Sequence, residues 1–316
     1  MPFIQILTNS ELDKLKEEQE SLKEGLLKIP VAYVYENDKL TDLIVCINID
    51  ENAEDEKLYE LSSDNHYTFK PYFYKPKNTG IACCIFGPRG SGKSHVLGEI
   101  LDNEFQNVES KDIFIFSRKD YDEPLDRPRI CKNQFNQVLD IAKTEKNLKK
   151  GIDKLVYTYV NKKGDEYVPI RLDPYDPEVQ MTPTEKYHNS YMIFDDVELM
   201  KDKHATIFLH RLRDSALLTG RSANIETFNI LHDIRGGKQY SVIRDESAFY
   251  VFFPLSNRAK IQKFLADYLE YNKTDVKRIL NLKLSNDSRA AVLRNAYPFC
   301  CISKSKILVL NIDNEN

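Results

Sequence analysis

A glycine-rich loop between a short apolar run and an amphipathic segment constrains the fold of this chain more than any other feature. The apolar run covers residues 81–86, the amphipathic segment covers residues 94–101, and the loop has the pattern G-x-x-x-x-G-K-[ST]. The run fits a buried parallel strand and the segment fits a helix. The order strand, loop, helix predicts a P-loop, whose backbone N–H groups close around phosphates. The candidate nucleotide-binding residues are Gly87, Pro88, Arg89, Gly90, Ser91, Gly92, Lys93, Ser94 and His95.

Two side chains of this loop have predicted roles in binding ATP and Mg²⁺. Lys93 is expected to reach the β and γ phosphates, and the Ser94 hydroxyl is expected to coordinate Mg²⁺. Both would act at the positive end of the helix, which favours anions. The alternative interpretation is a glycine turn without a ligand.

An acidic strand end supplies the second signal. The run Tyr191-Met-Ile-Phe-Asp-Asp196 is apolar until it reaches two carboxylates, which is typical of a Walker B strand. Asp195 is predicted to hold the water shell of Mg²⁺, and Asp196 is predicted to orient the attacking water. Glu198 is the alternative for that second role. A surface turn after a buried strand would explain the same pattern without catalysis.

Strand-like runs alternate with helix-length polar segments through most of the chain. This alternation predicts an α/β fold with a mostly parallel central sheet flanked by helices. Residues 154–170 resemble an inserted β-hairpin with a basic tip at Lys162 and Lys163. The tip is expected either to contact a phosphate backbone or to keep an exposed hairpin soluble. The predicted strands are residues 81–86, 112–117, 191–195, 225–231 and 248–253.

The first 75 residues are predicted to form a small α+β extension. A charged helix is expected near residues 10–28 with Ser10 as its N-cap, followed by strands at residues 30–35 and 43–48. Prolines and a glycine between residues 71 and 80 mark the entry to the second domain. The predicted domains are therefore residues 1–75 and residues 76–316, the latter ending in a tail of helices and strands.

Composition gives no global electrostatic case for nucleic-acid binding, because 45 basic and 49 acidic residues leave a net charge of −4. Any such binding must be local. Residues 201–244 hold an excess of lysine and arginine, part of which a solvated helix face explains as well as nucleic-acid binding does. The six cysteines lack metal-site spacing and are expected to be buried free thiols. No signal peptide or membrane span is predicted, and a reducing compartment is expected.

Four features together resemble the poxvirus-type genome-packaging ATPases of large DNA viruses and virophages, within the FtsK/HerA group of ring-forming DNA motors. The resemblance covers about residues 78–310. Its features are the P-loop with Lys93 and Ser94, the strand end Phe194-Asp195-Asp196, the turn Leu218-Thr219-Gly220-Arg221 before a strand ending at His232, and the tail from Tyr268 through Tyr297-Pro298.

The resemblance implies an additional-strand P-loop ATPase that translocates double-stranded viral DNA into a capsid. It implies a homo-oligomeric ring, possible contacts with capsid proteins, and a location in the host cytoplasm (viral factory) or the virion. Arg221 is then the candidate arginine finger, with Arg235 as its competitor, and His232 is the candidate γ-phosphate sensor. Arg211 and Arg213 are better suited to subunit or DNA contacts.

The chain departs from the family pattern at two positions: Leu231 precedes the histidine where serine is common, and Ser222 follows the Gly-Arg pair where histidine is usual. Three other functions stay open. A helicase or conjugation-type pump would share the catalytic residues, a P-loop kinase would phosphorylate an acceptor, and a capsid assembly factor would bind ATP with negligible turnover.

Overall fold

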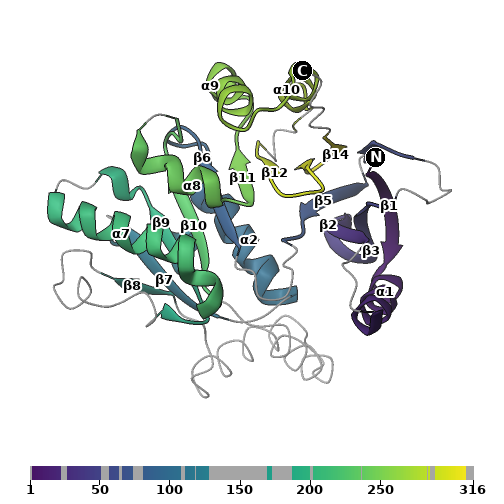
Figure 1. Ribbon diagram of the computed structural model, residues 1–316, viewed down its shortest axis with the longest axis horizontal. Coiled ribbons are helices and arrows are strands. Elements are labelled where there is room, and N and C mark those ends of the chain that lie inside the picture. The colour runs from purple at the N-terminus through teal and green to yellow at the C-terminus, as the bar shows by residue number, and fades with distance from the viewer. Residues whose placement is uncertain are drawn as a thin grey trace, which may run out of the picture. The chain divides into compact units, whose positions relative to one another are not determined.

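The computed structural model describes most of the chain as two compact units (Figure 1). The described residues are 2–22, 27–50, 57–63, 66–73, 81–107, 111–117, 119–127, 169–172, 187–199, 202–235, 237–282, 284 and 289–310. The first unit comprises Met1–Ser91 with Leu231–Asn316, and the second comprises Gly92–Ile230. The predicted hairpin at residues 154–170 lies almost entirely outside the described residues. The predicted domain boundary after residue 75 stays a prediction.

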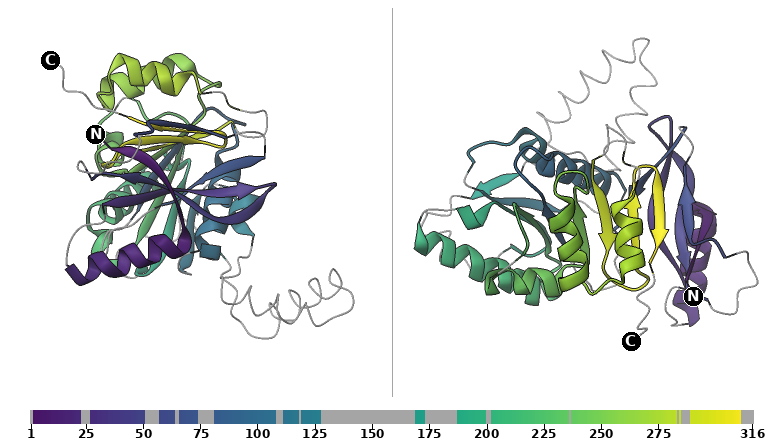
Figure 2. Two further views of the ribbon diagram at one scale, coloured as in Figure 1. Left: turned by 90° about the vertical axis from the view of Figure 1, so that its right-hand side faces the viewer. Right: turned by 90° about the horizontal axis from the view of Figure 1, so that it is seen from above.

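The second unit is a parallel sheet with a helix on each face. Its strands lie in the order β10-β9-β7-β8, and each neighbouring pair is parallel. Helix α7 packs its apolar side on β7 and β9, and α2 lies on the opposite face (Figure 2). The bounds are α2 Lys93–Asn107, β7 Asp112–Ser117, α3 Glu123–Asp126, β8 Ile170–Leu172, β9 Ser190–Asp195, η2 Val197–Leu199, α7 Lys203–Thr219, η3 Gly220–Ala223 and β10 Glu226–Leu231.

The position of β9 identifies the type of P-loop fold. This strand carries the predicted Walker B aspartates, and it pairs with β10 on one edge and with β7 on the other. A strand has only two edges for hydrogen bonding, so the strand that leads into the P-loop is not a neighbour of β9. In the additional-strand type of P-loop fold, the strand that leads into the P-loop is not a direct neighbour of the Walker B strand. The pairing of β9 with β10 and β7 therefore confirms the predicted fold class.

The first unit contains the strand that leads into the P-loop, within a mixed set of strands. Its order is β4-β14-β13-β12-β11-β6, in which only β11 and β6 pair in parallel. The bounds are β4 Glu60–Ser62, β6 Ala82–Phe86, η4 Lys238–Tyr240, α8 Ser241–Glu246, β11 Phe249–Phe252, α9 Arg258–Lys263, the π-helical turn η5 Phe264–Tyr268, α10 Lys273–Leu280, β12 Ala291–Arg294, β13 Cys300–Ser303 and β14 Lys306–Val309.

The amino-terminal residues form an antiparallel sheet of order β1-β3-β2-β5 beside helix α1. Apolar side chains of this sheet share one core with residues of β13 and β14, such as Ile302 and Val309. The capping prediction was wrong by two residues, because Thr8 and Glu11 exchange hydrogen bonds and cap the helix before Ser10. The bounds are β1 Phe3–Thr8, α1 Asn9–Leu22, β2 Lys28–Glu36, β3 Lys39–Asn48 and β5 Tyr67–Pro71.

The described cysteines are free and buried, as predicted; Cys131 lies outside the described residues. Burial raises the pKa of Cys46 to about 12 and that of Cys300 to about 12, which keeps these thiols protonated near neutral pH. They therefore serve packing and offer no nucleophile.

Candidate nucleotide-binding site

The backbone of the predicted P-loop requires glycine at three positions. Gly90 and Gly92 have φ angles of +76° and +96°, which strongly favour glycine. At Gly87 the constraint is space, because an added Cβ would lie 2.7 Å from Cδ2 of Phe253 and 2.8 Å from Oγ of Ser91. The glycines of the sequence motif are thus explained by local geometry.

Helix α2 begins at Lys93, directly after Gly92, so that Lys93 and Ser94 lie in its first turn. The Lys93 side chain is 8% exposed. Burial lowers the pKa of Lys93, although the carboxylates of Asp196 and Asp195 act in the opposite direction. The ammonium thus lies in the field of the two carboxylates predicted from the Walker B pattern.

Asp195 ends β9 and is fully buried. The Ser117 hydroxyl, opposite it at the end of β7, donates a hydrogen bond of 2.8 Å to its Oδ2 atom. Its Oδ1 atom is buried and has no hydrogen-bond partner among the described residues. Together with the Ser94 hydroxyl, this carboxylate offers the oxygen ligands that Mg²⁺ prefers, so the residues fit the metal that the fold implies.

Asp196 follows in a left-handed conformation with φ of +51°. Its N–H donates a hydrogen bond of 3.1 Å to the carbonyl of Ile230 in β10, which fixes the backbone at this point. A non-glycine residue held in this region is often part of a functional site. Glu198 lies two residues further, in the short helix η2.

A lysine and an aspartate that the sequence interpretation did not identify also lie at this strand end. The ammonium of Lys119 is 3.2 Å from Oδ2 of Asp195 and 2.8 Å from Oδ2 of Asp122. The Ser94 hydroxyl donates a hydrogen bond of 2.9 Å to the same Asp122 oxygen. Burial lowers the pKa of Lys119, but the hydrogen bond with Asp122 and the charge of Asp195 outweigh it and raise that pKa overall.

Arg171 in β8 holds the segment that carries these two residues. Its Nε and Nη2 atoms each donate a hydrogen bond of 2.5 Å to Asp126, and its Nη1 atom donates one of 2.7 Å to the Lys119 carbonyl. Asp126 in turn accepts a hydrogen bond of 2.5 Å from the N–H of Asp122. The segment 119–126 is therefore fixed by charge-assisted hydrogen bonds at both ends.

Arg221 lies at the edge of the parallel sheet opposite to this cluster. It is exposed in the turn η3, before β10 begins, whereas Asp195 ends β9, and the two strands are parallel. A strand of six residues spans about 20 Å. Arg221 therefore cannot reach the phosphate site of its own unit, and a finger role would require a neighbouring subunit.

A buried ion pair fixes the turn that bears Arg221. Lys111 is 1% exposed and its ammonium lies 2.7 Å from Oε1 of Glu226, which is fully buried. The same ammonium donates hydrogen bonds of 2.7 and 3.1 Å to the side-chain and backbone oxygens of Asn224. Asn224 has φ of +54° and closes the turn, so Lys111 ties the turn to the start of β10.

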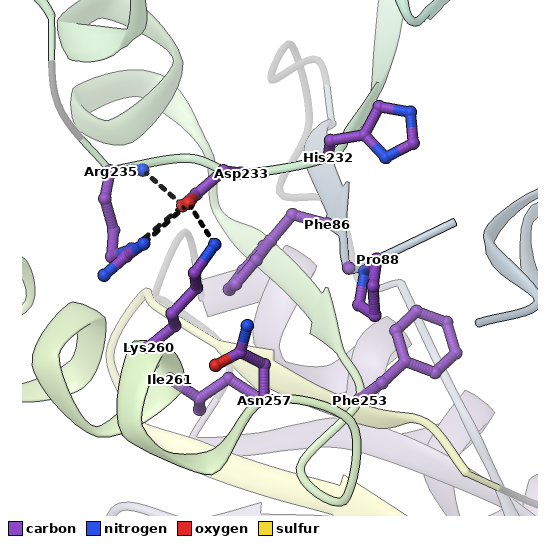
Figure 3. Close-up of a pocket in the computed structure, with 10 residues that line it drawn as sticks. Phe86, Pro88, His232, Asp233, Arg235, Phe253, Asn257, Lys260 and Ile261 are labelled. Carbon is purple, nitrogen blue, oxygen red and sulfur yellow. Dashed lines mark hydrogen bonds and ion pairs between the residues drawn. The ribbon is translucent and has the colours of Figure 1, made fainter. Parts of the chain in front are cut away.

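In the first unit, His232 lies beside the entrance of the P-loop. The N–H of Gly87 donates a hydrogen bond of 3.2 Å to the carbonyl of Leu231, so the two chain segments meet directly. A cavity of about 200 Å³ adjoins them. It is lined by Phe86, Gly87, Pro88, His232, Asp233, Arg235, Phe253, Asn257, Lys260 and Ile261 (Figure 3).

Arg235, the competitor for the finger role, is bound to Asp233 in this cavity wall. Its Nε and Nη2 atoms donate hydrogen bonds of 3.0 and 2.7 Å to the carboxylate, and Lys260 donates one of 3.1 Å. Burial raises the pKa of Asp233, but the hydrogen bonds from Arg235 and Lys260 outweigh it and hold that pKa well below its usual range. The His232 ring points away from this group (Figure 3).

Among the other predicted residues, Arg89 and His95 are exposed. The Nε2 atom of His95 lies 3.5 Å from Oε1 of Glu99, on the next turn of α2. The interpretation of Arg213 as a surface contact was wrong, because this side chain is fully buried and hydrogen-bonded to Asp214. Arg211 on the same helix is exposed. The nucleotide-binding and catalytic roles predicted from the sequence stay predictions.

No helix among the described residues is long and apolar enough to cross a membrane. No protein-family model matches the chain. Uncharacterized protein V3 of the Sputnik virophage is 30% identical over 128 residues, which are 40% of this chain and 51% of that protein. The chain thus aligns with about half the length of this curated relative.

Among solved structures, the chain is similar to the genome packaging NTPase B204 from Sulfolobus turreted icosahedral virus 2 in complex with ATP-gammaS. That match has a TM-score of 0.42 and 11% identity, and it covers 73% of this chain and 100% of the other. The chain is also similar to the pCW3 conjugation coupling protein TcpA, with a TM-score of 0.34, 11% identity, and coverage of 98% and 86%. The P-loop fold itself is established here by the strand order and the loop geometry.

Proposed function

We propose that this chain is an ATP-hydrolysing motor that translocates double-stranded viral DNA into a capsid. The observation that carries the proposal is the cluster of Lys93, Ser94 and Asp195 at the carboxyl end of a Walker B strand in an additional-strand P-loop fold. These residue types bind and polarise a nucleoside triphosphate. The similarity of 128 residues to a virophage protein supports the viral setting.

Each residue of the cluster has a distinct task. Lys93 binds the β and γ phosphates, while Ser94 and Asp195 would hold Mg²⁺, which neutralises charge on the phosphate oxygens when bound. Asp196 orients the attacking water and accepts its proton. His232, whose strand end meets Gly87, is the proposed sensor of the γ phosphate.

The location of Arg221 supports a homo-oligomeric ring. The side chain is exposed at the sheet edge opposite to Asp195, which leaves it accessible to a neighbouring subunit. There the guanidinium would offset the charge that develops on the transferring phosphoryl group, an effect of about 10³ to 10⁵ in rate. Double-stranded DNA and capsid proteins are the proposed partners, in the host cytoplasm or the virion.

The test is phosphate release from ATP and Mg²⁺ by the purified chain, with and without long double-stranded DNA. We expect DNA to stimulate the wild-type protein, and Lys93→Ala to lose turnover by about a hundredfold or more, because a preorganised phosphate ligand is removed. Lys263→Ala serves as the matched control, since Lys263 is 60% exposed on α9. It should keep the wild-type rate.

The other outcomes distinguish the alternatives. Near-normal turnover by Lys93→Ala would reject the P-loop assignment. Phosphorylated acceptor in place of free phosphate would indicate a kinase, and unwinding of a forked duplex would indicate a helicase. Nucleotide binding without turnover would indicate a capsid assembly factor.

A further inference from the structure

The ammonium of Lys119 occupies a place among the oxygens that the proposed function allots to a divalent cation. It lies 3.2 Å from Oδ2 of Asp195 and 2.8 Å from Oδ2 of Asp122, and the latter oxygen also accepts a hydrogen bond from Ser94. Two of these residues, Ser94 and Asp195, are the predicted metal ligands. One positive charge thus contacts one of them directly and the other through Asp122.

A second observation points to a ligand at the same place. Asp195 is fully buried, and its Oδ1 atom has no hydrogen-bond partner among the described residues. A buried carboxylate with one unsatisfied oxygen is costly unless a cation or donor completes its surroundings. Lys119 and Ser117 both contact the Oδ2 atom of Asp195, so its Oδ1 atom remains available to coordinate a metal ion.

We propose that Lys119 competes with a divalent cation for these carboxylates, and that Asp122 is a further carboxylate of the metal site. The inference rests on the proposed function for the identity of the nucleotide, whereas the competition itself needs only the metal. Divalent cation alone must then displace a positive charge, which weakens its binding. A nucleotide offsets this penalty because its phosphates bring additional negative charge and oxygen ligands.

The exchange requires movement of a side chain rather than of the backbone. The N–H of Lys119 donates a hydrogen bond of 3.1 Å to Oγ of Ser117, and its carbonyl is bound by Arg171. The side chain itself is 44% exposed, so its flexible stem can turn into solvent while the segment stays fixed. Asp122 remains where it is, since its N–H is held by Asp126.

The test is a titration of the nucleotide-free protein with Mn²⁺, in which the electron paramagnetic resonance signal measures the concentration of free Mn²⁺. Mn²⁺ takes the place of Mg²⁺ because both prefer oxygen ligands. We expect Lys119→Met to bind Mn²⁺ about tenfold more tightly than the wild type, because a positive charge about 3 Å from the ligands is removed. Lys119→Arg, which keeps the charge, should bind like the wild type.

Matched variants separate this effect from general changes. Lys263→Met removes an exposed lysine elsewhere and should leave the Mn²⁺ affinity unchanged. Adding Asp122→Asn to Lys119→Met should abolish the gain. Circular dichroism and thermal unfolding confirm that each variant is folded, and Lys119→Gln replaces Lys119→Met if the latter is not.

An unchanged Mn²⁺ affinity in both Lys119→Met and Lys119→Gln would overturn the competition. A gain that persists with Asp122→Asn would overturn the role of Asp122. These outcomes are independent of the proposed function, because no nucleotide or turnover is involved. A protein without ATP hydrolysis that shows the gain would contradict the proposed function alone.

Discussion

At the residue scale, the roles of Asp196 and Glu198, the two carboxylates that follow Asp195, can be distinguished by experiment. Asp196 has φ of +51°, and asparagine tolerates this region, so Asp196→Asn changes the charge while keeping the backbone. We expect this variant to lose turnover by about a hundredfold, because under the proposed function it lacks the general base, and to keep its affinity for ATP. Phosphate release and equilibrium binding of a fluorescent ATP analogue measure the two quantities.

Glu198→Gln is the matched control for this prediction. Glu198 lies in η2, one turn past the strand end. We expect less than about a threefold change in turnover, because under the proposed function Asp196 and not Glu198 acts as the base. A large loss in Glu198→Gln together with a small loss in Asp196→Asn would reverse the two roles.

The same residues show what a sequence can reveal about such a site. The loop glycines, Lys93 and Asp195 lie in contiguous motifs, because each acts where one strand ends and the chain turns. Lys119 and Asp122 carry no motif, and their location depends on Arg171, which is 52 residues from Lys119 in the sequence. The burial of Arg213 was also missed, since charge alone indicates exposure unless a buried partner is known.

At the element scale, the five strands predicted for the central sheet were confirmed. β6, β7, β9, β10 and β11 agree with the predicted bounds to within about one residue. Strands buried on both faces give largely apolar runs, although β10 also contains the buried polar residues Glu226, Thr227 and Asn229. The antiparallel order of β12, β13 and β14 was not predicted beyond a mixed tail. Antiparallel pairing across short turns is set by partners that a single sequence does not identify.

The buried pair of Lys111 and Glu226 is expected to support the start of β10 and the turn before it. Lys111→Met leaves the Glu226 carboxylate buried without its cation, and removing one partner of a buried pair costs about 3 kcal/mol or more. We therefore expect the free energy of unfolding, measured by urea denaturation, to fall by about that amount. The double variant Lys111→Met/Glu226→Gln should recover part of the loss, and an unchanged free energy in Lys111→Met would contradict this role.

At the scale of the whole molecule, the separation of Arg221 from Asp195 would make catalysis a property of an assembly under the proposed function. Each subunit would then supply Lys93 and Asp195 for one nucleotide, and Arg221 for the nucleotide of its neighbour. An Arg221→Ala subunit would then lose nothing at its own site and would impair the adjacent one. This coupling is absent if the exposed arginine only complements the carboxyl end of α7.

Mixing wild-type and variant subunits distinguishes these two possibilities. Mixed assemblies of wild-type and Arg221→Ala subunits should lose DNA-stimulated phosphate release, whereas mixtures with Arg289→Ala, an exposed arginine of the first unit, should not. Adding Lys93→Ala subunits gives the decisive arm. Neither Lys93→Ala nor Arg221→Ala assemblies should turn over alone, but their mixture should regain activity, because an intact phosphate site then meets an intact finger at some subunit boundaries. A mixture that stays inactive, although both variants assemble, would show that Arg221 does not act across the boundary.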